Sequence, residues 1–497
     1  MLAPIGPSPS LPAQVCQRAL DARDARFDGL FYVGIVTTGI YCRPTCPSRR
    51  ADPDHRRFFD TAAAAEHAGF RPCLRCRPEM APGKTLIDAV SRLASTAAHR
   101  IAAGALNGRS VADLAAELGV GERHLRRALR RELGVSPVEL AQIHRLLLAK
   151  RLLAETALTV TDIAFASGFE SLRRFNVAFR ERYGMSPTAL RRPAAARAAR
   201  RGAISPAGDL LRLTLAYRPP LAWDVLTAFL QREATPGVEI VEGRRYGRTV
   251  RLDGRSGVVF AEDAPVEAQV NVHISPALLP VLMPLLARLR QLFDLDAQPT
   301  VVDAHLERGG LGPLVRQRRG VRLPGALDGF EVGLRALLRG AAPSGEASRE
   351  LAGRVAQALG EPLETGIPGL HLLAPTAEQV AEAGASGLVE IGVPRRSAET
   401  IQAFARAVAS GALRLDPGSD MAETHRALLE IEGFDEGLAT TIVMRALYWP
   451  DAFPHSDRAL QEAAGAASPR ALLAKAEKWR PWRAYAALHL WLQHEEQ

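Results

Sequence analysis

The sequence predicts a multidomain protein that is mainly α-helical and has smaller α+β parts. The chain is 497 residues long, which is enough for three or four domains. Helical periodicity dominates two long stretches, residues 85–190 and 301–497. Between them, from about Ile204, short strand-like runs are joined by polar turns. We therefore expect a short N-terminal domain, a helical domain, a small sheet domain and a second helical domain, in this order.

The composition is that of a globular protein. Hydrophobic residues make up 47% of the chain and charged residues 24%. The sequence has no run of about 18 apolar residues, and its N-terminus lacks the basic segment and apolar core of a signal peptide. We expect a cytoplasmic protein with no membrane partner.

Positive charge is concentrated in the first 200 residues. They carry a formal net charge of +13, whereas the remaining residues carry −4. Because DNA is a polyanion, a basic region of this kind favours binding to its phosphates. We expect this region to supply most of the nonspecific affinity for DNA.

The N-terminal stretch contains a predicted metal site. Four of the five cysteines form two close pairs, Cys42/Cys46 (CxxxC) and Cys73/Cys76 (CxxC). Two short loops that each offer two thiolates can surround one ion, and four sulfur ligands are typical of a closed tetrahedral zinc site. The spacing alone leaves open whether the zinc ion only holds the domain together or takes part in chemistry. We expect Cys16 to be a buried or incidental thiol rather than a fifth ligand.

Arginines surround the four cysteines. Four thiolates around one divalent ion have a formal net charge of about −2, so nearby guanidinium groups would balance this charge and also present a face to phosphates. These arginines are Arg43, Arg49, Arg50, Arg71, Arg75 and Arg77. The predicted zinc site therefore lies next to a predicted phosphate-binding surface.

This stretch resembles the N-terminal domain of the Ada family, the DNA methylphosphotriester sensors of bacterial alkylation repair. The resemblance rests on FYVGIVTTGIYCRPTCPSRR and AGFRPCLRCRPE and extends from about Phe27 to Glu79. It implies that Cys42 is both a zinc ligand and the acceptor of the methyl group. The phosphate contacts that it implies are Thr38, Arg49, Arg71 and Arg75.

The implied chemistry agrees with the properties of zinc-bound cysteine. The thiolate is the nucleophilic form, and a metal ion keeps it deprotonated at neutral pH. We expect the transfer to be irreversible, because the thioether product is a poor leaving group. Methylation of Cys42 would also remove one negative charge that repels the DNA backbone, which would make the reaction a switch for DNA affinity.

Two similar helical units follow. Each has a short helix, a turn at Gly119 or Gly168, and a second helix followed by Gly-x-Ser-Pro. The pair resembles the paired helix-turn-helix domain of AraC-family regulators, which implies promoter DNA and RNA polymerase as partners. The arginines of the second helices that would reach the major groove or its phosphates are Arg123, Arg126, Arg127 and Arg130, and Arg173 and Arg174. At each single position, plain solvated charge is the alternative.

Residues 204–300 have the pattern of a small antiparallel sheet with helices on one face. Strand-like runs include LLRLTLAYR, RTVRL, GVVFAE and VEAQVNVHIS, and an apolar helix is expected from about Pro276 to Phe293. The Ala/Arg-rich stretch before them, at 193–203, is the expected linker. By itself this pattern indicates no function.

The last helical part carries a further resemblance. LLEIEGFDEGLATTIVMRALYWPDAFPHSDRAL and KWRPWRAYAALHLW resemble the helix-hairpin-helix DNA glycosylases, in particular the AlkA-type 3-methyladenine glycosylases. The resemblance implies Asp457 as the catalytic carboxylate, Phe229 and Trp491 in the base pocket, and Gly433 in a DNA-binding hairpin that also holds a monovalent cation. We expect Asp457 near a helix N-terminus, where its ionised form is stabilised.

The hairpin and the base pocket depart from the family pattern. Gly433 is followed two positions later by Asp435 rather than by a second glycine, which adds negative charge where a phosphate would bind. Arg458 follows Asp457 where an aromatic residue is common, and residues 339–344 replace the usual wedge. Two functions therefore stay open for the C-terminal half: excision of alkylated bases such as 3-methyladenine, or DNA binding with little or no excision.

The aromatic residues of the C-terminal tail divide into two kinds. We expect Trp482 and Tyr485 in the core, whereas Trp491 fits either the core or the base pocket. No cysteine follows Cys76, so we expect no second, thiol-dependent alkyl transfer from guanine O6.

These assignments divide the chain into five parts. The expected boundaries are 1–82 (zinc methyl-acceptor domain), 83–192 (paired helix-turn-helix domain), 193–203 (linker), 204–300 (AlkA-type N-terminal domain) and 301–497 (helix-hairpin-helix glycosylase domain). The expected protein is a monomer of the bacterial nucleoid that senses and repairs alkylated double-stranded DNA.

Overall fold

The structure is a computed structural model that describes residues 11–83, 92–191, 210–416 and 418–495. The chain divides into two compact units. The first comprises Met1–Pro219, Val266–Ala287 and Leu295–Ala297, and the second comprises Pro220–Pro265, Arg288–Asp294 and Gln298–Gln497. The expected linker at 193–203 lies outside the described residues. No helix in the described ranges is long and apolar enough to span a bilayer.

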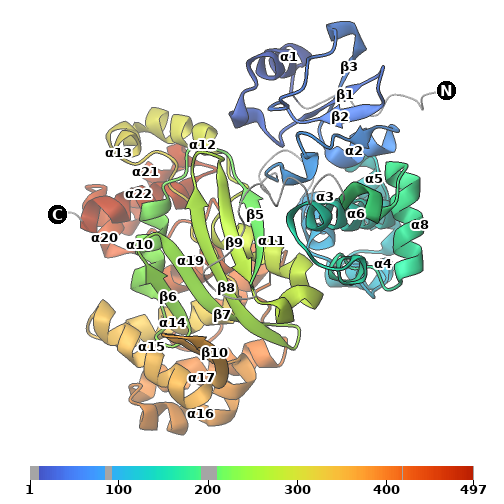
Figure 1. The fold of residues 1–497 in the computed structure, drawn as a ribbon. Helices are drawn as coiled ribbons and strands as arrows, with labels where there is room; N and C mark the ends of the chain where they lie inside the picture. The colour runs from blue at the N-terminus through green and yellow to red at the C-terminus, as the bar shows by residue number, and fades with distance from the viewer. Residues whose placement is uncertain (1–10, 84–91, 192–209, 417, 496–497) are drawn as a thin grey trace. The chain divides into compact units, whose positions relative to one another are not determined.

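The N-terminal part of the first unit contains a four-stranded sheet of order β3-β1-β2-β4 (Figure 1). Strands β1 and β2 form an antiparallel hairpin, β3 pairs antiparallel with β1, and the short β4 runs parallel to β2. The bounds are α1 (Ala13–Ala22), η1 (Ala25–Phe27), β1 (Tyr32–Ile35), β2 (Ile40–Cys42), η2 (Pro53–His55), β3 (Arg56–Phe59), α2 (Ala62–His67), β4 (Arg71–Pro72) and η3 (Pro78–Met80). The apolar, β-branched run before the first cysteine pair therefore forms β1, and the sheet places Cys42 at the end of a strand.

Two helix-turn-helix units follow, as predicted, and one long helix joins them. Their helices are α3 (Arg92–Ala102), α4 (Val111–Glu117), α5 (Glu122–Leu133), α6 (Pro137–Glu155), α7 (Val160–Ala166) and α8 (Leu172–Tyr183). Ser110, Ser136 and Thr159 begin α4, α6 and α7 with capping boxes, in which each side chain accepts a backbone N–H and an acid three residues on accepts the cap's own N–H. The two predicted turns lie between α4 and α5 and between α7 and α8.

Helix α6, which joins the two units, is buried around most of its surface. Leu140, Leu146 and Leu152 are at most 4% exposed. The same helix also buries two basic residues, Lys150 and Arg151, which are 2% and 8% exposed. Because burying a charge is costly unless the charge is paired, these two side chains require acidic or carbonyl partners.

The strand-like runs after residue 204 form antiparallel pairs, as predicted. In the first unit β5 pairs with β9 along its full length. In the second unit β6, β7 and β8 form an antiparallel meander, and helix α10 contacts β6 and β7. The bounds are β5 (Leu211–Ala216), α10 (Trp223–Glu233), β6 (Glu239–Glu242), β7 (Arg245–Leu252), β8 (Arg255–Ala264) and β9 (Gln269–Ile274).

The single helix expected from Pro276 to Phe293 is two helices in the structure. A 3₁₀ helix, η4 (Pro276–Val281), comes first, and α11 (Leu282–Leu292) follows it. Pro280 has no backbone N–H to donate, so a regular α-helical hydrogen bond is excluded at this point. This proline explains the break.

The helical part of the second unit has two apolar cores. Leu388 and Phe404 lie in one, and Leu460 and Trp479 lie in the other, and all four are at most 1% exposed. The helices are α12 (Pro299–Leu306), η5 (Glu307–Leu311), α13 (Gly312–Gln317), α14 (Gly329–Ala341), α15 (Gly345–Leu359), α16 (Ala377–Ile391), α17 (Arg395–Ala409), α18 (Met421–Leu429), α19 (Glu436–Ala446), α20 (Arg458–Ala463), α21 (Pro469–Ala476), η6 (Glu477–Trp479) and α22 (Arg483–Glu495). The helical character predicted for this part is confirmed with one exception.

The exception is a β-hairpin, made of β10 (Glu361–Ile367) and β11 (Leu370–Leu373). Its turn consists of Pro368 and Gly369. A Pro-Gly pair inside an otherwise helical stretch is a turn signal, so the sequence contains the information for this hairpin.

The buried His489 makes the second unit sensitive to acid. It lies on the buried side of α22 and is 1% exposed. Burial, and then the positive charge of Arg318, lowers the pKa of His489 from 6.5 to about 4. Between these two values the unfolded chain binds more protons than the folded one, so the free energy of unfolding is highest above pH 6.5 and falls as the pH drops to 4.

We expect a His489→Leu variant to lose this acid sensitivity. The substitution should remove up to about 3 kcal/mol of the pH dependence of unfolding, because the buried imidazole of His489 then no longer has to take up a proton. Thermal unfolding at about pH 5 and about pH 7.5 measures the effect, and His371→Leu at an exposed position serves as the control. A variant whose unfolding midpoint fell with acid as steeply as that of the wild type would contradict the assignment.

Candidate functional site

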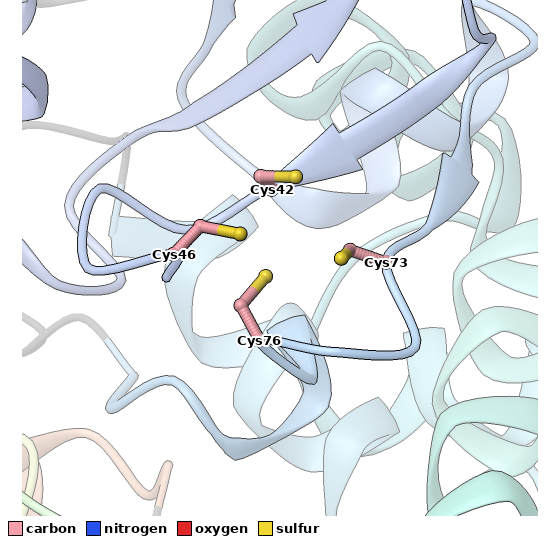
Figure 2. Close-up of side chains that lie close together, drawn as sticks. All are labelled: Cys42, Cys46, Cys73 and Cys76. Atoms are coloured by element: carbon pink, nitrogen blue, oxygen red, sulfur yellow. The ribbon is translucent and has the colours of Figure 1, made fainter. Parts of the chain in front are cut away.

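The four cysteines predicted to bind a metal converge on one point (Figure 2). Their sulfur atoms lie within 4.8 Å of one another, and the four residues are at most 9% exposed. Cys42 ends β2 and Cys46 lies in the next loop, whereas Cys73 directly follows β4 and Cys76 lies in the turn after it. Around a tetrahedral zinc ion four sulfurs would be about 3.8 Å apart, so this donor set fits zinc. Cys16 is fully buried and lies outside this group, as expected for a core thiol.

The thiols influence one another strongly. Hydrogen bonding within the cluster, first with Cys46, raises the pKa of Cys42, whereas hydrogen bonding with Cys42 lowers the pKa of Cys46. The pKa values of the two thiols move in opposite directions because sulfurs this close cannot all be ionised unless a cation neutralises them. In addition, the backbone N–H of Arg43 donates to Cys76 Sγ at 3.4 Å. The cluster therefore has the chemistry of a metal-binding tetrathiolate.

The six arginines near the cysteines fall into two groups. Three have acidic partners within the protein: Arg43 pairs with Asp28, Arg50 with Asp21, and Arg77 with Glu79 and Glu155. The other three, Arg49, Arg71 and Arg75, are exposed and form no ion pair with any described residue. Thr38, in the turn between β1 and β2, is exposed as well. The side chains of the four residues implied as phosphate contacts are thus exposed to solvent, whereas Arg43, Arg50 and Arg77 form ion pairs with acidic residues of the protein.

A lysine from α6 supports the second cysteine pair. Lys150 Nζ donates to the carbonyl oxygen of Cys73 at 3.2 Å and to Glu79 Oε2 at 2.6 Å. This residue lies more than 70 positions from the loop that it supports, so no local motif points to it. The signal in the sequence is compositional, because only four of the 63 basic residues are lysines.

The arginines expected to read DNA lie on the second helix of each helix-turn-helix unit. On α5, Arg123, Arg127 and Arg130 are exposed, whereas Arg126 donates to Glu122 at 2.8 Å. On α8, Arg173 and Arg174 are exposed. Five of these six side chains are therefore available to a groove or a phosphate, and Arg126 is partly neutralised.

Asp457 lies at a helix N-terminus, as predicted. It is the N-cap of α20, and its side chain accepts the backbone N–H of Leu460 at 2.9 Å. Helix α20 contacts α22, the helix that carries Trp491. A Cβ added at Gly437, in the first turn of α19, would lie 2.7 Å from Ser456 Oγ, so the hairpin helix touches the loop that ends at Asp457.

The two aromatic residues implied for the base pocket lie on neighbouring helices. An ion pair of 2.7 Å between Arg232 and Glu495 joins α10 to α22, and Phe229 and Trp491 lie about one turn before these two residues. The ring of Phe229 has the guanidinium carbon of Arg445 4.8 Å from its centroid. The guanidinium of Arg445 therefore already lies over the face of the Phe229 ring, which weakens the attraction of this ring for a cationic base.

The remaining aromatic residues of the tail agree with the expectation of core packing. Tyr485 is 3% exposed, and Trp482 is half-buried against the same core. Trp491 is also half-buried against this core, so its position is compatible with both packing and pocket lining.

In the predicted hairpin, a carboxylate of the protein itself already binds at the N-terminus of the second helix. Gly433 has a left-handed backbone with φ of +92°, and a Cβ there would lie 2.2 Å from Thr400 Oγ1. Two residues later, Asp435 is the N-cap of α19 and accepts the backbone N–H of Leu438 at 2.7 Å. One of the helix N-terminal amides that would meet a phosphate is thus already hydrogen-bonded.

We expect Gly433→Ala to destabilise the hairpin. The positive φ alone costs at least about 1–2 kcal/mol for an L residue, and the contact with Thr400 adds to it. Gly411→Ala is the matched control, because Gly411 also has a positive φ of +75° but has no atom within 4 Å of its added Cβ. Chemical denaturation of both variants measures the difference, and equal losses of stability would contradict the role of the contact.

The structure also contains a cavity of about 230 Å³ in the second unit. Residues of β7, the start of α14 and the start of α16 line it, among them Arg251 and Glu331, together with Arg288 of α11. Asp457, Phe229 and Trp491 do not line it. This cavity is therefore not the predicted base pocket.

Three family descriptions match the chain. "Metal binding domain of Ada" matches residues 15–79, "Helix-turn-helix domain" matches residues 114–193, and "AlkA N-terminal domain" matches residues 212–328. The first match spans all four clustered cysteines. The second covers part of α4 and all of α5 to α8, and the third covers β6 to β9 and all but the first residue of β5.

Similarity to known proteins extends over nearly the whole chain. A Mycobacterium tuberculosis protein described as "Probable bifunctional transcriptional activator/DNA repair enzyme AlkA" is 39% identical over 486 residues, which cover 96% of each chain. "DNA-3-methyladenine glycosylase 2" of Escherichia coli is 32% identical over 56% of this chain and 96% of its own length. "Bifunctional transcriptional activator/DNA repair enzyme Ada" of Escherichia coli is 50% identical over 12% of this chain and 17% of its own length. The chain therefore belongs to the family of bifunctional transcriptional activators and DNA repair enzymes of the AlkA type, and its residues 15–79 match the metal-binding domain of Ada.

Proposed function

We propose that this protein takes methyl groups from DNA methylphosphotriesters onto Cys42, activates transcription in its methylated form, and excises alkylated bases such as 3-methyladenine. The observation that carries the proposal is the convergence of four buried cysteine sulfurs near three exposed arginines that form no ion pair within the described part of the chain. Thiolates are nucleophiles, and guanidinium groups bind phosphates. The site therefore offers an acceptor for the methyl group and cations for the phosphate that carries it.

The methyl transfer is a displacement at carbon. Cys42 Sγ forms a bond to the methyl carbon, the bond between that carbon and the phosphate oxygen breaks, and the oxygen keeps the electron pair as an ordinary phosphodiester. A zinc ion held by Cys42, Cys46, Cys73 and Cys76 would keep the attacking sulfur deprotonated at neutral pH. The product is a thioether, which is a poor leaving group, so each molecule reacts once.

Methylation would change the affinity of the first unit for DNA. One negative charge disappears when Cys42 becomes a thioether, and a pair of unit charges 4 Å apart is worth about 1 kcal/mol in water or about 4 kcal/mol at an effective dielectric constant of 20. The upper value corresponds to about a 10³-fold change in affinity. Thr38, Arg49, Arg71 and Arg75 would contact the phosphates in this complex.

The regulatory part of the proposal assigns promoter binding to the two helix-turn-helix units. Their exposed arginines, Arg123 and Arg127 on α5 and Arg173 and Arg174 on α8, would enter the major groove or hold the flanking phosphates. RNA polymerase is the partner that an activator requires. A single chain with two such units can bind an asymmetric site as a monomer, with the domain boundaries near residues 82, 192, 203 and 300.

The excision step would depend on Asp457. Alkylation of a purine ring nitrogen makes the base a cationic leaving group, so the site needs to stabilise the sugar cation and to orient water rather than to protonate the base. A carboxylate at the start of α20 suits both tasks, because its hydrogen bond to the backbone N–H of Leu460 holds it in a fixed position. The base would be flipped toward Phe229 and Trp491.

A second candidate function for the C-terminal half is DNA binding without excision. The hairpin favours this function, because Asp435 caps α19 at the position where a phosphate would bind. The ring of Phe229 favours it as well, because the guanidinium of Arg445 already lies over this ring. Release of 3-methyladenine from alkylated duplex DNA by the purified chain decides between the two candidates.

Intact mass spectrometry tests the methyl-transfer proposal. The purified chain should contain one zinc ion and should gain the mass of one methylene group after incubation with a duplex that carries methylphosphotriesters. Peptide mapping should place the added group on the peptide that contains Cys42. A chain without zinc, or a chain whose mass does not change, would refute the proposal.

A further inference from the structure

The metal centre has a buried cationic neighbour that comes from the DNA-reading part of the chain. Lys150 lies in the last third of α6, the helix that joins the two helix-turn-helix units. Its side chain is 3% exposed and donates to the carbonyl oxygen of Cys73 and to Glu79 Oε2. The Glu79 side chain is 2% exposed, so the whole contact is buried.

This contact holds a metal-ligand loop from outside its own domain. Cys73 and Cys76 belong to a short turn that follows the two-residue strand β4, so few sheet hydrogen bonds fix it. The ammonium group bonds the backbone of the first ligand and the acid three residues after the second ligand. It therefore spans the turn between Cys73 and Glu79.

The same ammonium group also bears on the charge of the centre. A tetrathiolate with one divalent ion has a formal charge of about −2, and in a buried setting such a charge needs nearby cations. Arg43 is neutralised by Asp28, and Arg77 by Glu79 and Glu155. Lys150 and Arg77 share Glu79, and Arg77 and Arg151 share Glu155, so three cations face two acids and one positive charge is in excess on this side of the cluster.

We propose that Lys150 is a positioning residue of the metal centre, supplied by the linker helix of the regulator to hold the Cys73–Cys76 turn and to offset the charge of the thiolates. The inference rests on the proposed zinc centre and deepens it, because the DNA-reading part then completes the site that accepts the methyl group. Supporting groups around metal ligands typically change metal affinity by about 10- to 100-fold when they are removed.

The connection continues along α6 beyond the metal centre. Glu79 Oε1 accepts from Arg77 Nε at 3.3 Å, and Arg77 Nη2 donates to Glu155 Oε1 at 2.7 Å. Glu155 in turn accepts from Arg151 on the same helix and from the backbone N–H of Thr214 in β5, both at 3.3 Å. A continuous series of partly buried ion pairs therefore connects the Cys73–Cys76 turn to α6 and to β5.

The test compares Lys150→Met with Lys150→Arg in the full-length chain. Lys150→Met should lower zinc affinity about 10-fold or more, measured by competition with a chromophoric chelator, and should shift the thiolate-to-cobalt charge-transfer bands of the Co²⁺-substituted protein. Lys150→Arg keeps the positive charge and should recover part of both properties. Lys475→Met is the matched control, because Lys475 also donates to a backbone carbonyl, that of Ala464, in the other unit.

Two results would overturn the proposal. One is a Lys150→Met protein with unchanged zinc affinity and cobalt spectrum. The other is an equal loss in the Met and Arg variants, which would assign the effect to packing rather than to charge. Both readouts need no DNA, so a wild-type chain that binds zinc but accepts no methyl group would refute the proposed function while leaving the role of Lys150 measured. A wild-type chain that binds no zinc would refute both.

Discussion

Cys42→Ser should take up no methyl group from a methylphosphotriester duplex, while the variant stays folded and keeps its metal. The serine hydroxyl is not ionised at neutral pH and cannot replace the thiolate as nucleophile, so the expected loss of transfer is complete. Retention of the metal is expected because three thiolates remain, and three protein ligands with an open fourth position are common around zinc. Intact mass and zinc content of the same sample measure both properties.

Cys46→Ser is the matched comparison, because it removes a neighbouring sulfur. Cys42 is held in β2 by its pairing with Val33, whereas Cys46 lies in a loop outside the sheet. We expect Cys46→Ser to bind zinc more weakly than Cys42→Ser and to destabilise the N-terminal part, because Cys46 is the ligand that ties the loop after β2 to the metal, and metal binding and folding are coupled in small zinc domains. Methyl uptake by the Cys42→Ser protein would show that another sulfur is the acceptor.

Asp457→Asn should lower the rate of 3-methyladenine release by at least about 10²-fold. The substitution removes the negative charge that would stabilise the sugar cation, and losses of this order follow the removal of single electrostatic groups from active sites. Asparagine is a good N-cap and has nearly the same shape, so α20 should remain intact. Single-turnover release of base from an alkylated duplex measures the change.

Glu462→Gln provides the control for this second experiment. Glu462 is an acid on the same helix, and its partner is the exposed Arg458. Its neutralisation changes the net charge by the same amount as Asp457→Asn but leaves the proposed catalytic carboxylate in place. If the wild type and both variants released base equally slowly, the C-terminal half would be a DNA-binding module and not an enzyme.

The features predictable from sequence were those that local spacing determines. The two cysteine pairs, the capping residues and turns of the helix-turn-helix units, and the position of Asp457 before a short helix all depend on residues within a few positions of one another. Their geometry follows from chain connectivity and from hydrogen bonds at the helix ends. The structure confirms that the cysteines converge and that Asp457 is an N-cap.

The features that sequence reasoning missed depend on distant contacts. Which of the six arginines near the cysteines form ion pairs and which stay exposed depends on the positions of acids such as Asp28, Glu79 and Glu155. The spacing of the arginines in the sequence contains no information about these acids. The same is true of Arg445 over Phe229, which lies more than 200 positions away in the chain. In contrast, Pro280 and the pair at 368–369 were visible signals for the breaks in the expected helices.

The ion pairs between α6 and residues 77–79 also affect what happens when the N-terminal domain is lost by a deletion in the gene. If the gene lost the codons before residue 84, Lys150 would keep its charge without Glu79, and Glu155 would lose Arg77. Because the lost residues also cover this flank of α6, Lys150 and Glu155 would become solvated, so their charges would cost little. What the shortened protein would lose is the packing of η3 against α6.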